Sequence, residues 1–147
     1  MKKLVMLASA AVLALSLNSC SDDDSGSGSV SGNKLEGKWE RNTQKLSAIG
    51  QTTGEQPYLG NEEGCSKDFI EFGADGAYAE GDYFGDGCTL TTTTGTYTVD
   101  GKDVTVTGNA ADEYTVVSVS GTKLKIKYVT QVNNVNFVDE YTFTKAN

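Results

Sequence analysis

Apolar and polar residues alternate along much of the second half of the chain. In the segments "GTYTVDG", "KDVTVTG" and "TKLKIKY", Val, Leu, Ile or Tyr recurs at every second position, with Thr, Lys or Asp in between. A period of two places the apolar side chains of a strand on one face of a sheet. The pattern therefore predicts strands that are buried on one face and solvated on the other. We expect such strands over residues 37–44, 67–73, 77–82, 89–93, 95–100, 102–107, 113–118, 123–130 and 135–144.

Turn signals separate these strands at short intervals. They are Ala74-Asp75-Gly76, Asp100-Gly101 and Ser120-Gly121. Asp-Gly favours a two-residue type I′ hairpin, because that turn needs a positive φ at both central residues. Strands joined by tight hairpins are antiparallel neighbours, and a long meander protects its edge strands by closing on itself. The sequence therefore predicts an all-β fold, an antiparallel up-and-down meander closed into a β-barrel of about eight strands.

The barrel interior is expected to take the apolar residues of the alternating pattern. The inward-facing residues are Trp39, Ile70, Phe72, Tyr78, Tyr97, Val99, Val104, Val106, Val116, Leu124, Ile126, Tyr128, Tyr141 and Phe143. A small barrel is either filled by such side chains or open to one small ligand, and a tyrosine suits both roles. A simple packed core is therefore the alternative to a pocket. The candidate ligand-lining residues are Tyr78, Tyr97, Tyr128, Tyr141 and Phe143.

The first residues have the composition of an export signal. Two lysines precede an apolar run over residues 4–17, which is shorter than the about 20 residues of a membrane span. The following Leu17-Asn18-Ser19-Cys20 resembles a bacterial lipobox, in which the cysteine thiol receives a diacylglycerol and becomes the mature N-terminus. The resemblance implies a signal peptide over residues 1–19 and a membrane anchor on Cys20. A plain signal peptide with an incidental cysteine is the alternative.

Three aspartates follow this cysteine. An acidic cluster in this position, Asp22, Asp23 and Asp24, resembles the export signal of Bacteroidetes-type lipoproteins, which implies an outer-membrane lipoprotein exposed at the cell surface. A solvated acidic spacer is the alternative, since Asp beside Ser and Gly is typical of disordered tethers. We expect a flexible tether over residues 20–33 and one folded domain over residues 34–147.

Composition limits the chemistry that this domain can perform. The 147 residues include no histidine, which excludes a Ser-His-Asp or Cys-His centre, a His-ligated zinc and a histidine pH switch. The net charge is −8, and loss of Lys2 and Lys3 with the signal would take it to about −10. Nucleic acid is not an expected partner, because phosphate binding needs clustered Lys and Arg. We expect no enzymatic activity, no cofactor and no metal.

Two cysteines remain once Cys20 carries a lipid. Cys65 and Cys88 form an even pair in an exported domain, which predicts a disulfide. The alternative is a reactive thiol, but neither cysteine has a neighbouring His or a Cys-x-x-Cys arrangement to lower its pKa.

The start of the first strand resembles a known family. In "LEGKWE", Gly37 and Trp39 resemble the G-x-W entry of lipocalins. The later order of "DFIEFGADGAYAE", "GTYTVDGKDVTVTG", "TKLKIKY" and "EYTFTK" is similar to that of small lipocalin-like domains in Bacteroidetes lipoproteins, over residues 35–145. The resemblance implies a lipocalin-like barrel that binds a small apolar or amphipathic ligand in or at its mouth. Unlike the larger lipocalins, the chain leaves no room for a helix after the last strand, and only Lys145 remains to cover the tryptophan.

One loop suggests two further roles. The segment "EGDYFGDG", residues 80–87, gathers carboxylates and glycines that suit calcium, although it lacks the final Glu of a calcium loop. Its Tyr83 and Phe84 instead suit contact with sugars or proteins at a barrel rim. The alternative function is therefore a non-enzymatic surface module that contacts glycans or partner proteins through its rim loops.

An enzyme would need paired carboxylates in a cleft. The candidate pairs are Glu62 with Glu63 and Glu71 with Glu80, which the sequence does not place at a catalytic separation. The long segment 45–64, which contains the single proline of the chain, is expected to be a lid over the barrel mouth or a mobile loop.

Overall fold

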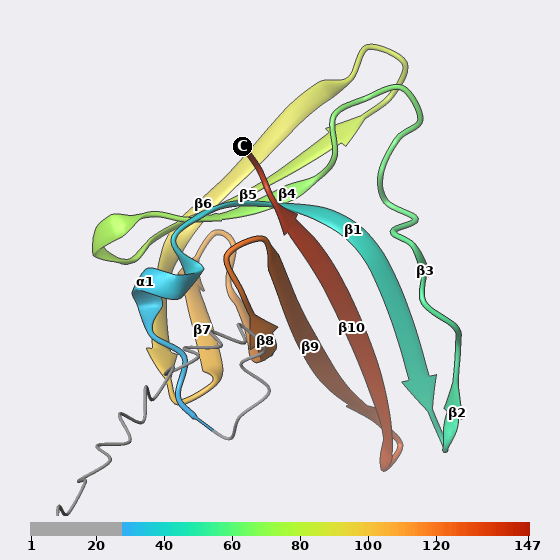
Figure 1. Cartoon of the computed structure of the whole chain (residues 1–147). Coiled ribbons are helices and arrows are strands. Elements are labelled where there is room, and N and C mark those ends of the chain that lie inside the picture. The colour runs from blue at the N-terminus through green and yellow to red at the C-terminus, as the bar shows by residue number, and fades with distance from the viewer. Residues whose placement is uncertain (1–27) are drawn as a thin grey trace, which may run out of the picture.

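The computed structural model describes residues 28–147, which fold almost entirely as β-strands (Figure 1). The predicted signal peptide, Cys20 and the three aspartates lie outside the described residues. The elements are α1 (Gly32–Leu35), β1 (Gly37–Ala48), β2 (Gln51–Thr52), β3 (Gln56–Pro57), β4 (Phe69–Phe72), the 3-10 turn η1 (Ala74–Gly76), β5 (Ala77–Phe84), β6 (Thr89–Asp100), β7 (Asp103–Gly108), β8 (Asp112–Val119), β9 (Lys123–Val132) and β10 (Val135–Lys145).

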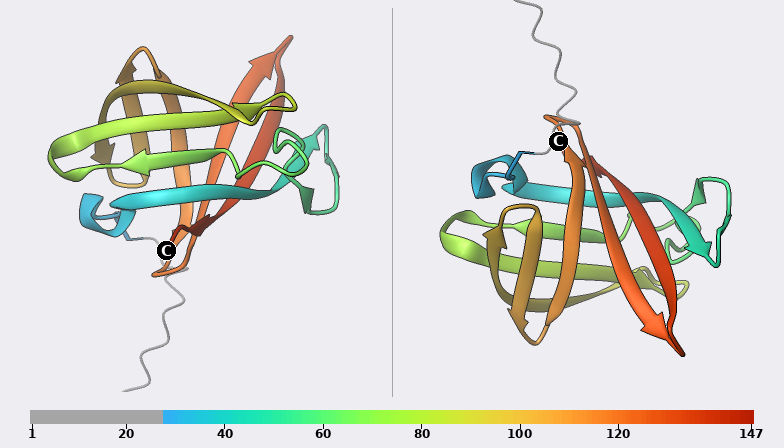
Figure 2. Two further views of the ribbon diagram at one scale, coloured as in Figure 1. Left: turned by 90° about the horizontal axis from the view of Figure 1, so that it is seen from above. Right: turned by 90° about the horizontal axis from the view of Figure 1, so that it is seen from below.

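The longer strands form one closed barrel. Each pairs antiparallel with the next in the order β1, β4, β5, β6, β7, β8, β9, β10, and β10 returns to pair with β1. The predicted all-β barrel is therefore confirmed. α1 and β2 lie at opposite ends of β1 (Figure 2). We call the end that carries α1 the closed end and the opposite end the mouth.

The two strands predicted over residues 89–93 and 95–100 are one continuous strand, β6. Gly95 is the first residue of the second predicted strand, and it serves a close approach between β6 and β7. A Cβ atom at Gly95 would lie 2.2 Å from the carbonyl oxygen of Thr107 on β7. The glycine therefore lets β6 and β7 pair here without ending either strand.

One hairpin differs from the expected turn chemistry, and another adopts that chemistry at a different pair of residues. The residues between β6 and β7 are Gly101 and Lys102, and of these only Gly101 has a positive φ, of 63°. This is the pattern of a type II′ turn and not of the type I′ turn expected from Asp-Gly. Asn133 and Asn134, between β9 and β10, both have positive φ, of 51° and 63°. The type I′ pattern therefore occurs at an Asn-Asn pair, because asparagine tolerates the left-handed region better than most residues.

The closed end is built around Trp39, which is fully buried. Its Nε1 donates a hydrogen bond of 2.6 Å to the carbonyl oxygen of Leu35, the last residue of α1. Lys145 Nζ lies 5.0 Å from the centre of the indole ring, so this lysine covers the tryptophan as expected. Gly37 has a φ of 117°, and a Cβ there would lie 2.8 Å from Lys145 Cε. Glycine at position 37 therefore permits both the backbone bend and the passage of the lysine.

Residues before α1 already pack on the barrel. The backbone N–H of Val30 donates a hydrogen bond of 2.6 Å to Gly101, and its side chain packs against the core. The predicted boundary between tether and domain, at residues 33 and 34, therefore falls inside α1. Packing contacts are already present before the predicted boundary, because Val30 supplies apolar area to the closed end.

The segment 45–64 extends the barrel wall at the mouth. The end of β1 occupies its first residues, β2 and β3 pair with β1, and Tyr58 N donates a hydrogen bond of 3.0 Å to Asn42. The side chain of Asn61 bridges the Arg41 carbonyl and the Asp68 backbone N–H, each at 2.9 Å. These contacts fix the segment beside β1, so it forms wall where we expected a lid or a mobile loop.

The predicted disulfide is confirmed. Cys65 and Cys88 are joined, with their Cα atoms 5.3 Å apart. The bond links the segment before β4 to the turn between β5 and β6, and thus ties two parts of the mouth together.

Removal of the disulfide should destabilise the barrel. We expect the double variant Cys65→Ser/Cys88→Ser to lose about 3 kcal/mol of unfolding free energy, the chain-entropy value for a loop of this length. Urea unfolding followed by circular dichroism measures the loss, and reduced wild-type protein is the matched control. A loss below about 1 kcal/mol in both samples would contradict the expectation.

Candidate functional site

Side chains fill the barrel interior near the closed end. The expected inward-facing residues are all buried or packed against the core. Near the closed end, Phe72 packs edge to face with Tyr97 at a centroid distance of 4.9 Å, and the Tyr97 hydroxyl approaches the Gly73 carbonyl at 3.4 Å. We call this packed layer, with Trp39 and Phe143, the floor. The floor is therefore a hydrophobic core.

A β-bulge in β1 changes which side chains enter the barrel above the floor. Arg41 pairs with Phe143 and Gln44 pairs with Tyr141, so Asn42 is an extra residue in β1. Phe143 and Tyr141 are two positions apart on β10 and face the interior. Arg41 and Gln44 therefore both face inward, and each is only 8% exposed.

Tyrosines surround Arg41 above the floor. Ring centroids are 5.4 Å apart for Tyr114 and Tyr128, 5.6 Å for Tyr128 and Tyr141, and 5.8 Å for Tyr141 and Tyr58. We call the whole group the polar belt; it comprises Arg41, Tyr58, Tyr78, Glu80, Tyr114, Tyr128 and Tyr141. The belt joins residues from β1, β5, β8, β9, β10 and the segment after β3.

Arg41 lies at the centre of the polar belt. It forms an ion pair with Glu80, and its guanidinium carbon is 5.1 Å from the Tyr58 ring centre and 5.6 Å from that of Tyr141. Burial opposes the charge on Arg41, but Tyr58 and Glu80 outweigh this effect, so the pKa of Arg41 lies above its ordinary value. Burial raises the pKa of Glu80, against the lowering effect of Arg41. Formation of the Arg41–Glu80 pair therefore costs part of the solvation free energy of the Glu80 carboxylate.

The belt tyrosines are neutral hydroxyls. Burial is the main cause that raises the pKa of Tyr78, Tyr114 and Tyr128. None of the three is expected to ionise at physiological pH. They are therefore available as hydrogen-bond donors and acceptors.

Two buried polar atoms of the belt lack hydrogen-bond partners within residues 28–147. They are Arg41 Nε and the hydroxyl oxygen of Tyr114, whose side chains are almost completely buried. Tyr78 acts on the pKa of the Tyr114 hydroxyl both by charge and through a close side-chain contact, but the two hydroxyls do not meet at full hydrogen-bond geometry. A buried unsatisfied donor or acceptor costs about 1–3 kcal/mol. Each atom therefore retains a hydrogen bond that no residue of 28–147 supplies.

An apolar groove continues the interior face to the mouth. Leu46 lies opposite Asp139, and Ala48 lies opposite Phe137, two and four positions beyond the inward-facing Gln44. With residues of β2, these side chains line a groove of about 430 Å³, which we call the mouth groove. Leu46 and Phe137 are 37% and 40% exposed. The mouth groove therefore offers apolar surface directly beyond the polar belt.

The structure divides the expected ligand-lining residues into two groups. Tyr78, Tyr128 and Tyr141 lie in the polar belt, whereas Tyr97 and Phe143 lie in the floor. The alternation correctly placed all five on the interior face. It did not distinguish their heights along the barrel, because height depends on strand register.

Three belt residues were not indicated by the pattern of the sequence: Arg41, Tyr58 and Tyr114. Tyr114 was identifiable, since it precedes the expected inward residue Val116 by two positions. Arg41 follows Trp39 by two positions, but a charged side chain is rarely expected inside a barrel. Tyr58 comes from a segment without alternation, so only the fold brings it to the belt.

The structure also places the residues considered for an enzyme, for calcium and for contact at the rim. Glu80 faces the interior and pairs with Arg41, whereas Glu71 is exposed on the outer face of β4, so these carboxylates do not share a cleft. Glu62 and Glu63 are exposed in the loop before β4. Among the described residues, no three carboxylate, thiol or imidazole side chains gather as a metal site. Phe84 is 51% exposed at the end of β5, and Tyr83 packs against Phe69 at 6.5 Å.

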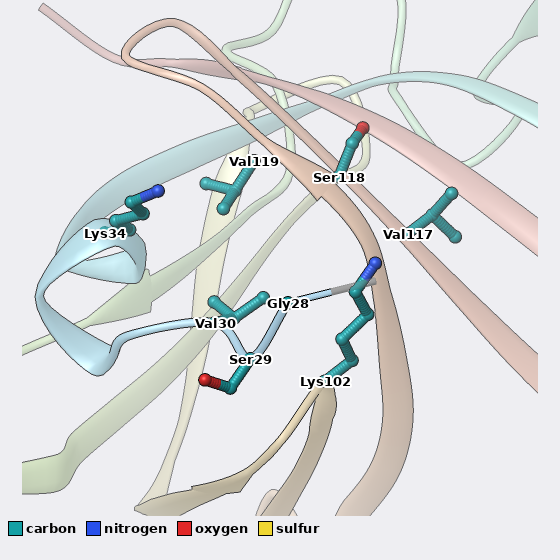
Figure 3. Close-up of a pocket in the computed structure, with 8 residues that line it drawn as sticks. All are labelled: Gly28, Ser29, Val30, Lys34, Lys102, Val117, Ser118 and Val119. Carbon is teal, nitrogen blue, oxygen red and sulfur yellow. The ribbon is translucent and has the colours of Figure 1, made fainter. Parts of the chain in front are cut away.

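A second, much smaller pocket lies where the chain joins the closed end. Ser29, Val30 and Lys34 line it with Lys102 and residues of β8 (Figure 3). Its volume is about 30 Å³, the space of about one water molecule. It therefore accommodates solvent and not an organic ligand.

Comparison with known families agrees with this architecture. The family model of the lipocalin-like domain matches residues 35–126, from the end of α1 into β9. No curated protein is a significant match for the chain. The described part of the chain contains no helix with the length and apolar character of a membrane span.

Proposed function

We propose that this chain, which belongs to the lipocalin-like domain family, is a non-enzymatic lipoprotein of the Bacteroidetes type that binds a small apolar or amphipathic ligand. The lipocalin-like barrel itself favours ligand binding. The proposed anchor is a lipid on Cys20, and the proposed location is the cell-surface side of the outer membrane. The lipobox-like Leu17-Asn18-Ser19-Cys20 and the acidic cluster after it support this address.

The observation that carries the binding proposal is the change of chemistry along the interior face. Apolar groove residues such as Leu46 and Phe137 adjoin a belt with two unpartnered polar atoms. An apolar pocket with few placed polar groups is typical of small-molecule sites. A ligand with an apolar body and a polar head would match both parts at once.

Exposed apolar residues at the mouth support a second role. Ile49 and Leu59 are 78% and 76% exposed, and Phe84 is 51% exposed. Ile49 also has a positive φ of 50°, which is unfavourable for a β-branched residue. Contact of this rim with glycans or a partner protein is therefore the alternative function.

Native mass spectrometry tests whether the barrel carries a ligand. The sample is residues 21–147 purified from the native cells, which retains every described residue of the closed barrel and of its core. A mass above that of the denatured chain would identify a retained small molecule and support the proposal. An unliganded chain that also fails to bind added apolar probes would contradict it and favour the rim.

A single substitution tests the mouth groove. We expect Phe137→Ala to weaken binding of the neutral fluorescent probe N-phenyl-1-naphthylamine about tenfold, because the ring supplies apolar area to the groove. Val129→Ala is the matched control, since Val129 is 56% exposed on the same β9–β10 hairpin but does not line the mouth groove. Equal effects of the two substitutions on probe fluorescence titrations would exclude the groove as the binding surface.

A further inference from the structure

The charges that face the interior allow the head group of the ligand to be specified. Asp139 lines the mouth groove and lies opposite Tyr128 of the belt in the β9–β10 pairing. The inner edge of the groove therefore meets the polar belt. A ligand whose body lies in the groove would direct its head toward the polar belt, which holds the unpartnered atoms of Arg41 and Tyr114.

The positive charge of Arg41 is already neutralised by a carboxylate. Its partner Glu80 is on β5, and both side chains are inside the barrel. An anionic head group could take this place only by separating the pair. The pairing therefore removes the attraction that a buried arginine would otherwise exert on a carboxylate or phosphate.

Further acidic residues lie on the mouth side of the belt, where Asp82 is exposed and Asp112 is half-buried. Asp82 and Asp112 both act electrostatically on Glu80, and Asp112 also acts on Tyr128. Asp82 lies two positions beyond Glu80 on β5, and Asp112 lies opposite the buried Val106. With Asp139 at the groove, the mouth side of the belt carries an excess of negative charge. An anionic head would therefore be repelled at neutral pH.

The unpartnered atoms favour an acceptor over a cation. Arg41 Nε is a donor and requires an acceptor, and the Tyr114 hydroxyl can donate or accept. An ammonium head supplies donors alone and would leave Arg41 Nε unsatisfied. A hydroxyl or carbonyl oxygen can accept from both atoms without adding charge.

We propose that this barrel selects uncharged amphipathic molecules, whose hydroxyl or carbonyl head is bound by Arg41 Nε and the Tyr114 hydroxyl while the apolar body lies in the mouth groove. This inference rests on the proposed ligand-binding function. It assigns to Glu80 the role of excluding anionic heads by neutralising Arg41. It assigns to Tyr114 the role of a hydrogen-bonding contact with the head.

The test compares three probes with the same tail. They are 1-decanol, decanoate and decylammonium, each used at pH 7.5 to displace N-phenyl-1-naphthylamine from residues 21–147. We expect decanol to bind about tenfold more tightly than either ion. Decanoate or decylammonium binding as tightly as decanol would overturn the inference while leaving ligand binding intact. Failure of all three to bind would overturn both the inference and the proposed function.

Two variants separate the roles of the belt residues. Tyr114→Phe should weaken decanol binding about fivefold, because its head loses one hydrogen bond, with an unchanged or higher unfolding midpoint. Tyr83→Phe is the matched control, since Tyr83 packs on the outer face against Phe69.

Glu80→Gln should strengthen decanoate binding about tenfold and change decanol binding little, because the Arg41 charge is no longer neutralised by a carboxylate. An unaltered decanol affinity in Tyr114→Phe, or an unaltered decanoate affinity in Glu80→Gln, would overturn the corresponding assignment.

Discussion

Trp39→Ala is expected to lower the free energy of unfolding by about 4 kcal/mol, within the range for large aromatic residues removed from a core. Trp39 is fully buried at the centre of the closed end. The substitution removes its packing, its hydrogen bond to Leu35 and the ring that Lys145 covers. The remaining cavity would be closed off by α1 and the floor, so neighbouring side chains have little freedom to fill it.

Urea unfolding followed by far-ultraviolet circular dichroism measures this effect, since Trp39 is the only tryptophan and its fluorescence disappears with it. Phe84→Ala is the control, because Phe84 is 51% exposed at the mouth, and its loss should be below about 0.5 kcal/mol. Trp39→Phe should be intermediate, since it retains an aromatic ring but loses the donor. Similar losses for Trp39→Ala and Phe84→Ala would contradict the assignment of the closed end as the stabilising core.

Arg41→Met is expected to lower the free energy of unfolding by about 3 to 4 kcal/mol at pH 8, because it leaves the Glu80 carboxylate inside the barrel without its cation. The effect should shrink at lower pH. Burial raises the pKa of Glu80 and Arg41 lowers it, so removal of Arg41 raises this pKa further. A carboxyl group with a raised folded-state pKa favours folding at low pH, and this contribution is lost as the pH rises from about 4.5 through the folded-state value.

The comparison of pH 5 and pH 8 in urea unfolding is the decisive measurement for Arg41. Lys38→Met is the matched control, since Lys38 is on the same strand and lies over an aromatic ring, 3.7 Å from the centre of Phe69, but on the outer face. The double variant Arg41→Met/Glu80→Gln should recover most of the loss, because no uncompensated charge remains. A loss that is independent of pH, or a double variant as unstable as Arg41→Met, would contradict this account of the pair.

The alternation of apolar and polar residues predicted the fold because every second residue of each barrel strand faces the interior. Val104, Val106, Leu124 and Ile126 each occupy the inward position of their strand, as a period of two requires. The predicted division of β6 before Gly95 is wrong, because a glycine can mark either a turn or a close approach between strands. Only the 2.2 Å distance to the Thr107 carbonyl distinguishes the two.

The polar belt was predictable only in part, since it depends on features that local pattern does not encode. The bulge at Asn42 shifts the period of β1, so that Arg41 and Gln44 both face inward although they are three positions apart. Tyr58 reaches the belt from a segment between strands, and Glu80 meets Arg41 across a separation of 39 residues. Such long-range pairings follow from strand register and closure. The tyrosines at strand positions were accessible to sequence reasoning, whereas their arginine was not.

The chain enters the barrel at its closed end. Val30 is hydrogen-bonded to Gly101 at the closed end, and α1 continues from there into β1. With the proposed anchor at Cys20, the attachment to the bilayer would join the closed end, and the mouth would be the end of the barrel farther from that attachment. Under this proposal the tether would leave the mouth unobstructed for ligand exchange.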